Sequence, residues 1–260
     1  MIKLRDVWKR FGKLQVLAGL NLDVHDGETL VVLGPSGIGK SVLLKHIIGL
    51  LKPDQGTVDV DGTLISELEG TKLLTAIHHM GMLFQGGALF DSMTVEENVG
   101  FYLKENGDPR TGEKLSKKEI AERVSTALEM VGLQGTQSKM PAELSGGMRK
   151  RAALARVIVY RPQIVLYDEP TTGLDPIIAM QINELIIKTQ KELKATSIVV
   201  THDMFSALYV GDRLALIRDG KIAHIADPNA FLKIDDPLIK FLYNSISQDP
   251  RKLKENNHHG

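Results

Sequence analysis

The sequence predicts an α/β fold built on a largely parallel β-sheet. Short apolar runs at residues 29–33, 163–167 and 197–201 have the length of buried strands and are rich in β-branched side chains. Residues 177–193 have helical spacing and separate the second run from the third. Strands that alternate with helices favour parallel pairing, with helices covering both faces of the sheet.

The amino-terminal elements follow in order. Residues 2–8 alternate apolar and charged side chains, which predicts an opening strand. The strand at 29–33 ends at a glycine and leads into residues 41–51, which are apolar and favour a helix. Asp61-Gly62 predicts a hairpin turn, and residues 80–84 predict another short strand.

The middle of the chain has a different pattern. No strand is evident between residues 86 and 161, whereas residues 119–131 and 146–160 have helical spacing. Residues 104–118 are polar and contain glycine and proline, which predicts a solvated loop. We therefore expect an inserted helical subdomain at about 86–161.

The last elements predict a closing hairpin and a tail. Residues 214–217 and 222–225 are apolar runs on either side of the turn dipeptide Asp219-Gly220. Residues 247–260 are polar, and we expect them to be frayed. The expected organisation is one domain over residues 1–245 and a polar carboxy-terminal tail over 246–260.

Composition narrows the possible functions. The 260 residues carry a formal net charge of zero, so a broad nucleic-acid-binding surface is not expected. There is no cysteine, which excludes a disulfide scaffold and a thiolate metal site. The first residues lack the apolar core of a signal peptide, and no apolar run is long enough to span a membrane. Work at a membrane would therefore need a partner.

A glycine-rich loop follows the strand at 29–33 and precedes a helix. Residues 34–41 (GPSGIGKS) match the pattern GxxxxGK[ST], in which glycines let backbone N–H groups face phosphate oxygens. Lys40 can neutralise the β- and γ-phosphates, and Ser41 can offer its hydroxyl to Mg²⁺. The alternative is a chance glycine loop. The candidate phosphate-binding residues are Gly34, Pro35, Ser36, Gly37, Gly39, Lys40, Ser41 and Val42.

Two acids end the strand at 163–167. Ligands bind at the carboxyl ends of strands in open α/β sheets, and Asp168 and Glu169 come directly after this strand. Asp168 is placed to support Mg²⁺ through water, and Glu169 is placed to activate the attacking water as general base. The alternative is that both carboxylates lie at the surface and cap the turn before Pro170.

A second glycine turn lies in the helical segment. Ser145, Gly146 and Gly147 open a helix whose first turn carries Arg149 and its basic neighbours, which oppose the helix dipole. The functional interpretation is that the serine and the glycine amides face an incoming γ-phosphate. The structural interpretation is that Ser145 is only an N-cap.

Three single residues are candidates because of their positions after strands or before a helix. Gln85 is placed to sense Mg²⁺ or the attacking water, and His202 is placed to bind the γ-phosphate. Asp175 precedes Pro176 and is equally well explained as a helix N-cap.

These motifs, in this order, resemble the ATP-binding-cassette (ABC) family of transporter ATPases. The resemblance runs from about residue 2 to residue 227 and implies a P-loop NTPase fold, with a RecA-like parallel sheet core, an antiparallel β subdomain and an inserted helical subdomain. It implies ATP and Mg²⁺ as cofactors, Phe11 as the aromatic residue that stacks on adenine, and Gln85, Asp175 and His202 in the family's Q-loop, D-loop and switch positions.

Two segments resemble the ATPases of bacterial and plastid lipid transporters of the MCE (Mla) type. They are residues 84–95 (FQGGALFDSMTV) and residues 144–151 (LSGGMRKR). Four departures from the wider family remove no catalytic group. They are Met148 in place of glutamine, Val42 in place of threonine, Ile38 in place of a small polar residue and Phe11 in place of tyrosine.

The resemblance also implies partners. Two cassettes would meet head to tail as a homodimer, with ATP at Lys40 and Ser41 of one closed over by Ser145 and Gly147 of the other. An integral membrane permease would bind near Ala88, Leu89, Phe90 and Met93, unless these side chains simply pack in the core. The same resemblance implies phospholipid as the cargo, with an MCE-domain protein and a small STAS-domain regulator as further partners. It also implies a peripheral position on the cytoplasmic face of the inner membrane.

Alternative functions remain. One is ATP-driven transport of another substrate, and another is a soluble ABC ATPase of DNA repair or translation, although the long coiled-coil insertion or second cassette of such proteins is not found here. A third is a nucleotide-dependent assembly module without catalysis, against which Glu169 and His202 argue. A GTPase is disfavoured because no Asn-Lys-x-Asp guanine-reading motif occurs.

Overall fold

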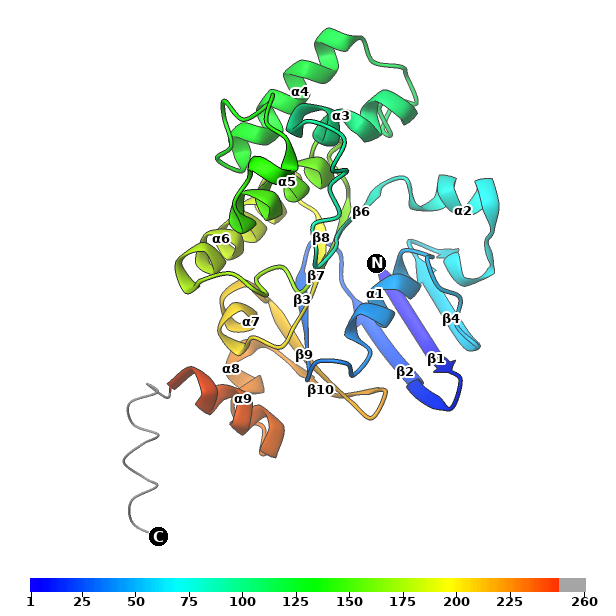
Figure 1. Ribbon diagram of the computed structural model, residues 1–260. Helices are drawn as coiled ribbons and strands as arrows, with labels where there is room; N and C mark the ends of the chain where they lie inside the picture. The colour runs from blue at the N-terminus through cyan, green and yellow to red at the C-terminus, as the bar shows by residue number, and fades with distance from the viewer. Residues whose placement is uncertain (248–260) are drawn as a thin grey trace.

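A six-stranded sheet forms the centre of the molecule. The computed structural model describes residues 1–247, and Figure 1 shows this sheet between the helical subdomain and a second, smaller sheet. The strand order is β10-β9-β3-β8-β7-β6, and all neighbours pair in parallel except β10 with β9. Its strands are β3 (Thr29–Leu33), β6 (Met80–Leu83), β7 (Ile164–Asp168), β8 (Thr196–Thr201), β9 (Arg213–Arg218) and β10 (Lys221–Ala226).

The central strands are buried on both faces. Every residue of β3, β7 and β8 is buried, which explains why these strands appear as continuous apolar runs in the sequence. Successive side chains of β3 enter two different core clusters: Val31 and Leu33 face one, and Leu30 and Val32 face the other. The sheet therefore divides the core into two layers.

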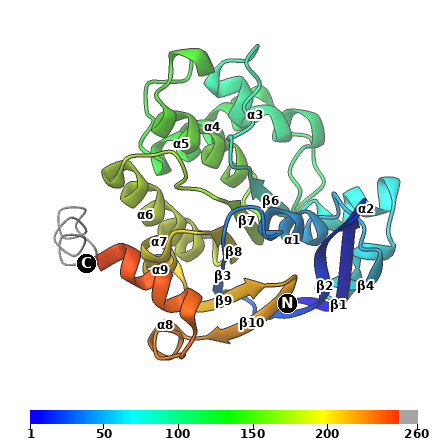
Figure 2. The same ribbon diagram turned by 60° about the horizontal axis from the view of Figure 1, so that its bottom comes forward.

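The helices lie in both layers. Leu43 and Leu44 of α1 pack with the second sheet on one side of the parallel sheet, whereas Ile182 of α6 and Ala207 of α7 pack on the other side. The helices of this core are α1 (Lys40–Ile47), α6 (Pro176–Leu193), α7 (Met204–Val210), α8 (Pro228–Phe231) and α9 (Pro237–Ser247). Figure 2 shows α8 and α9 beside the β9–β10 hairpin.

The second sheet is antiparallel, with the order β2-β1-β4-β5. Its strands are β1 (Ile2–Phe11), β2 (Leu14–Val24), β4 (Gln55–Val60) and β5 (Thr63–Leu64), followed by a short 3₁₀ helix, η1 (Ile65–Glu67), and by α2 (Gly70–Ile77). Asp61 and Gly62 both have positive φ, 52° and 81°, and form the predicted turn between β4 and β5. The predicted opening strand extends three residues further, to Phe11.

The helical subdomain contains α3 (Val95–Asn106), α4 (Lys117–Met130), the 3₁₀ helix η2 (Pro141–Glu143) and α5 (Gly146–Ile158). Figure 1 shows these helices grouped above the parallel sheet. Thr94 and Ser116 begin α3 and α4 with capping boxes, in which serine or threonine and the glutamate three residues later satisfy each other's backbone N–H groups. Residues 86–161 contain no strand, as predicted.

Some predicted boundaries were wrong. The segment 104–118 is not all solvated loop, because α3 continues to Asn106 and α4 begins at Lys117. The connection between them is fastened by Asp108, which is buried and accepts a hydrogen bond from Arg123 at 2.6 Å. The helix after the glycine loop is shorter than predicted. It ends at Ile47, two residues before Gly49, whose positive φ does not continue the helix.

The carboxy-terminal part ends in a short helix fixed to the sheet. Asp236 is buried, and its carboxylate accepts hydrogen bonds from Arg218 at 2.6 Å and from the backbone N–H of Leu238 at 2.8 Å. The predicted tail lies outside the described residues apart from residues 246–247. Within residues 1–247, no helix is long and apolar enough to cross a membrane.

Two glycines of the β4–β5 hairpin, Gly56 in β4 and Gly62 in the turn, give a matched test of backbone packing. Gly56 and Gly62 have similar φ values, +84° and +81°, but a Cβ on Gly56 would lie 2.1 Å from the Asp6 carbonyl oxygen, whereas one on Gly62 meets nothing within 4 Å. Gly56→Ala should lower the free energy of unfolding by about 3 kcal/mol or more, and Gly62→Ala by about 1 kcal/mol. Urea denaturation measures both, and equal losses would contradict the packing argument.

Candidate active site

The glycine loop between β3 and α1 is shaped by close packing. Gly39 has a φ of +109°, and a Cβ there would lie 2.6 Å from a methyl carbon of Val16. A Cβ on Gly34 would lie 2.7 Å from Ile217. These two positions accept only glycine without local movement. The loop therefore holds the start of α1, and with it Lys40, against the beginning of β2 and the end of β9.

The ends of three strands bring the catalytic candidates together. Leu33 pairs with Thr201, and Asp168 pairs with Val200, so β3, β7 and β8 end at nearly the same level. The residues that follow these strands therefore share one edge of the sheet. Glu169 and His202 are two of them, and the nitrogen Nδ1 of His202 lies 2.9 Å from a carboxylate oxygen of Glu169.

A cavity of about 270 Å³ opens at this edge. Most of the side chains and backbone that line it are residues predicted from the sequence, and they come from the glycine loop, the first strand and the ends of three parallel strands. The predicted residues are Phe11, Ser36, Gly37, Gly39, Lys40, Ser41, Val42, Gln85, Glu169 and His202, and Val16 and Thr172 complete the lining.

Lys40 is the buried cation of the cavity. Its ammonium group donates hydrogen bonds to the carbonyl oxygens of Gly34 at 2.7 Å and Pro35 at 3.0 Å, and it forms an ion pair of 3.1 Å with Glu169. The side chain is only 4% exposed, so its charge is weakly screened and acts strongly on anions at the loop.

Glu169 is buried and ionised. Burial alone would raise the pKa of its carboxyl group, but the charge and hydrogen bond of Lys40, with the charge of His202, bring that pKa below its ordinary value. Thr172 also donates a hydrogen bond to this carboxylate at 3.0 Å. The carboxylate is therefore held in the protonation state that a general base requires.

Asp168 and Ser41 form the other polar pair. The Ser41 hydroxyl donates a hydrogen bond to Asp168 at 2.7 Å. Burial raises the pKa of Asp168, helped by the nearby Glu169 charge, while the bond from Ser41 opposes the rise. A hydroxyl and a carboxylate are oxygen ligands that suit Mg²⁺, so this pair fits a magnesium ion held together with nucleotide phosphates.

Some predicted residues lie outside the cavity. Ser145 caps α5 by accepting a hydrogen bond from the Met148 N–H at 3.3 Å, and Asp175 caps α6 by accepting from Ile177 and Ile178. Within this chain both residues thus have the structural role that was the alternative interpretation. Gly146 is exposed, whereas Gly147 is buried, and a Cβ on Gly147 would lie 2.6 Å from Ile178.

Sequence reasoning missed three residues of the site. Thr172 and Val16 line the cavity, and Lys150 donates a hydrogen bond to the backbone carbonyl of Glu169 at 3.2 Å. Thr172 lies three residues after the predicted base, which was a usable signal. Lys150 lies between two arginines in the sequence, and nothing in that basic run distinguishes the buried member.

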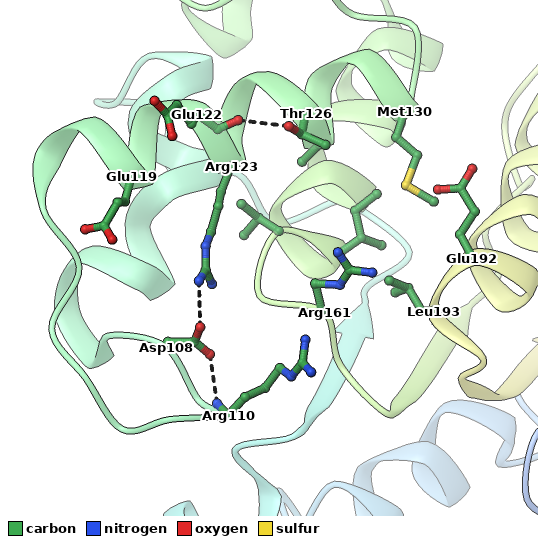
Figure 3. A pocket seen from close by; sticks show the side chains of 13 residues that line it. Asp108, Arg110, Glu119, Glu122, Arg123, Thr126, Met130, Arg161, Glu192 and Leu193 are labelled. Carbon is green, nitrogen blue, oxygen red and sulfur yellow. Dashed lines mark hydrogen bonds and ion pairs between the residues drawn. The ribbon is translucent and has the colours of Figure 1, made fainter.

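A separate cavity of about 400 Å³ lies between α4, the end of α5 and the end of α6. Figure 3 shows its polar lining, in which Asp108 accepts hydrogen bonds from the side chain of Arg123 and the backbone N–H of Arg110. None of the residues predicted to bind nucleotide line it. These bonds close the loop between α3 and α4, so we assign the cluster a structural role.

The chain is similar to known ATP-binding proteins over most of its length. The family model described as ABC transporter matches residues 17–172. A probable ribonucleotide transport ATP-binding protein from Mycobacterium leprae is 38% identical over 254 residues, covering 98% of this chain and 72% of that protein. The chloroplastic protein Trigalactosyldiacylglycerol 3 from Arabidopsis thaliana is 38% identical, covering 92% of this chain and 72% of that protein.

A similar solved structure is a dimeric ATP-binding cassette in a post-hydrolysis state with ADP and Pi. It has a TM-score of 0.79 and 33% identity, and covers 88% of this chain and 99% of that one. The fold is thus that of an ABC ATPase cassette, with ATP and Mg²⁺ as cofactors. The chain belongs to the ABC transporter family and is the ATP-binding and ATP-hydrolysing subunit of such a transporter.

Proposed function

We propose that the cavity at the glycine loop binds and hydrolyses ATP, with the roles divided among the residues found there. The observation that carries the proposal is the meeting of a buried cation, Lys40, a hydroxyl–carboxylate pair, Ser41 with Asp168, and an ionised base, Glu169, at one edge of the sheet. The glycine-loop amides would hold the phosphates, and Phe11 would stack on adenine.

The residues of this chain divide the chemistry as follows. Lys40 attracts the γ-phosphate oxygens, and Glu169 accepts a proton from the water that attacks the γ-phosphorus as the bond to the ADP oxygen breaks. His202, hydrogen-bonded to Glu169, keeps that carboxylate oriented, and Gln85 lies at the cavity wall to contact the water or the metal. Ser41 and Asp168 would hold Mg²⁺, which neutralises phosphate charge when bound.

We infer that two copies act together, head to tail. Ser145, Gly146 and Gly147 do not line the cavity that contains Lys40 of the same chain, although they form an N-capped helix start suited to an anion. A second copy is therefore the molecule whose γ-phosphate they would meet, and Asp175 would lie at the same seam. A dimeric cassette with 33% identity supports this arrangement.

A membrane permease and a lipid cargo complete the proposal. Phe90 is 42% exposed, and Ala88 is also exposed, so part of the predicted apolar group is free to receive a permease beside Gln85. The chain would then sit peripherally on the cytoplasmic face of the inner membrane. Segments 84–95 and 144–151 support an MCE-type phospholipid system, with an MCE-domain protein and a STAS-domain regulator, and one relative is named for a glycolipid.

Other relatives are named for three water-soluble cargos. They are named for ribonucleotide, trehalose/maltose and sulfate/thiosulfate transport at 36–38% identity. The cargo therefore has to be tested on the assembled transporter.

Two substitutions should separate ATP binding from turnover. Glu169→Gln keeps the size of the side chain but removes the base, so ATP should still bind while phosphate release falls by about 10³-fold or more. Lys40→Ala removes the buried cation, so ATP affinity itself should fall by about tenfold or more. Calorimetry measures binding and a phosphate assay measures turnover. Full phosphate release by Glu169→Gln would falsify this residue as base.

The pH dependence of kcat/KM should report the ionisation of Glu169 in the free protein. Because the His202 charge helps to lower the pKa of Glu169, His202→Ala should raise that pKa, and the acidic limb of the profile should move to higher pH. His202→Gln, which keeps a hydrogen-bonding group but no charge, should move the limb in the same direction. An unmoved limb in both variants would contradict the assigned electrostatics.

The permease and the cargo are tested together. Tagged full-length chain isolated from the membranes of its own cells should bring down a multi-span membrane protein, and added phospholipid should raise the ATPase rate of that complex severalfold. Maltose, sulfate and a ribonucleotide serve as the comparison. Stimulation by one of these instead would contradict the lipid cargo, and isolation without any membrane protein would contradict the transporter role.

A further inference from the structure

Lys150 is the fifth residue of α5, and its side chain is turned into the protein. Its side chain is buried, with 7% exposure, and its ammonium group donates a hydrogen bond to the Glu169 carbonyl at 3.2 Å. Its two basic neighbours stay within the helical subdomain: Arg149 donates to the Leu144 carbonyl, and Arg151 donates to the carbonyls at the end of α4. Of this basic run, only Lys150 reaches the catalytic strand end.

The burial of this cation is not needed for packing. Burial lowers the pKa of Lys150, and the charges of Asp168 and Glu169 act in the opposite direction. An apolar side chain of similar length would fill the same space without the cost of removing a charge from water. The position of the ammonium group is therefore best explained by what it contacts.

The contact is made to a strained peptide. Glu169 has a φ of +47°, in a region that side-chain-bearing residues rarely occupy. Its N–H donates to the Val200 carbonyl at 3.0 Å, and its own carbonyl accepts from Lys150 and, at 3.3 Å, from the Thr172 N–H. A conformation of this kind persists only when neighbouring groups hold it, and Lys150 is the one charged group that holds the Glu169 backbone in the described part of the chain.

We propose that Lys150 is a positioning residue that fixes the backbone of Glu169 and thereby aims its carboxylate at the attacking water. The inference rests on the proposed role of Glu169 as base. It also connects the glycine turn at the start of α5 to that base, because Ser145 caps this helix and Lys150 is its fifth residue. A displacement of this turn would reach Glu169 through one side chain.

Lys150→Met and Lys150→Gln form a matched pair, since the two side chains have equal length and only glutamine can donate a hydrogen bond. In the full-length protein with Mg-ATP, Lys150→Met should lower kcat about tenfold while KM and the Kd of a nonhydrolysable ATP analogue change less than about twofold. Lys150→Gln should recover about threefold or more of that loss. Lys191→Met, on the exposed surface of α6, is the control and should behave as wild type.

A double-mutant cycle tests whether Lys150 acts through Glu169. Combined with Glu169→Gln, Lys150→Met should cause no further loss of the residual rate; an additive loss would overturn the proposal. So would unchanged kcat in Lys150→Met, parallel loss of kcat and analogue affinity, or thermal melting below the assay temperature in both Lys150 variants. Full activity in Glu169→Gln would instead overturn the general-base assignment, so the two failures are distinguishable.

Discussion

The site depends on one constraint, the level at which three buried parallel strands end. β3, β7 and β8 are buried on both faces and pair in register, so the residues after them have no freedom to separate. The glycine loop, Glu169 and His202 each follow one of these strands. Parallel strands all point the same way, and the chemistry therefore gathers at a single edge. Packing of apolar side chains thus sets the distances between charged ones.

Charge balance in a poorly solvated place is the second requirement. Lys40 and Lys150 are buried cations, and Asp168 and Glu169 are buried anions. Each would be costly alone, but together they neutralise one another and have hydrogen-bond partners from backbone carbonyls and hydroxyls. The same arrangement keeps Glu169 ionised, because the charge of Lys40 lowers its pKa.

Much of the fold was predictable because its signals are local. The β-branched runs of β3, β7 and β8 and the turn at Asp61-Gly62 were identified with small errors at the ends. β2, β4 and α2 were not predicted, although alternate residues of β2, Leu20, Leu22 and Val24, are apolar and buried. The loop at 104–118 was misjudged because its buried carboxylate, Asp108, has a partner fifteen residues away on the next helix.

The sequence by itself determined the order of the motifs, the parallel core, and the residues of the glycine loop and strand ends, because these depend on short-range backbone geometry and on the period of burial. Only the tertiary structure decided which basic side chain of α5 is buried, that Val16 joins the cavity, and that the φ of Glu169 is positive. These features arise from contacts between segments far apart in the chain. No local pattern encodes the direction in which a lysine turns, since that depends on which carbonyl the folded core presents to it.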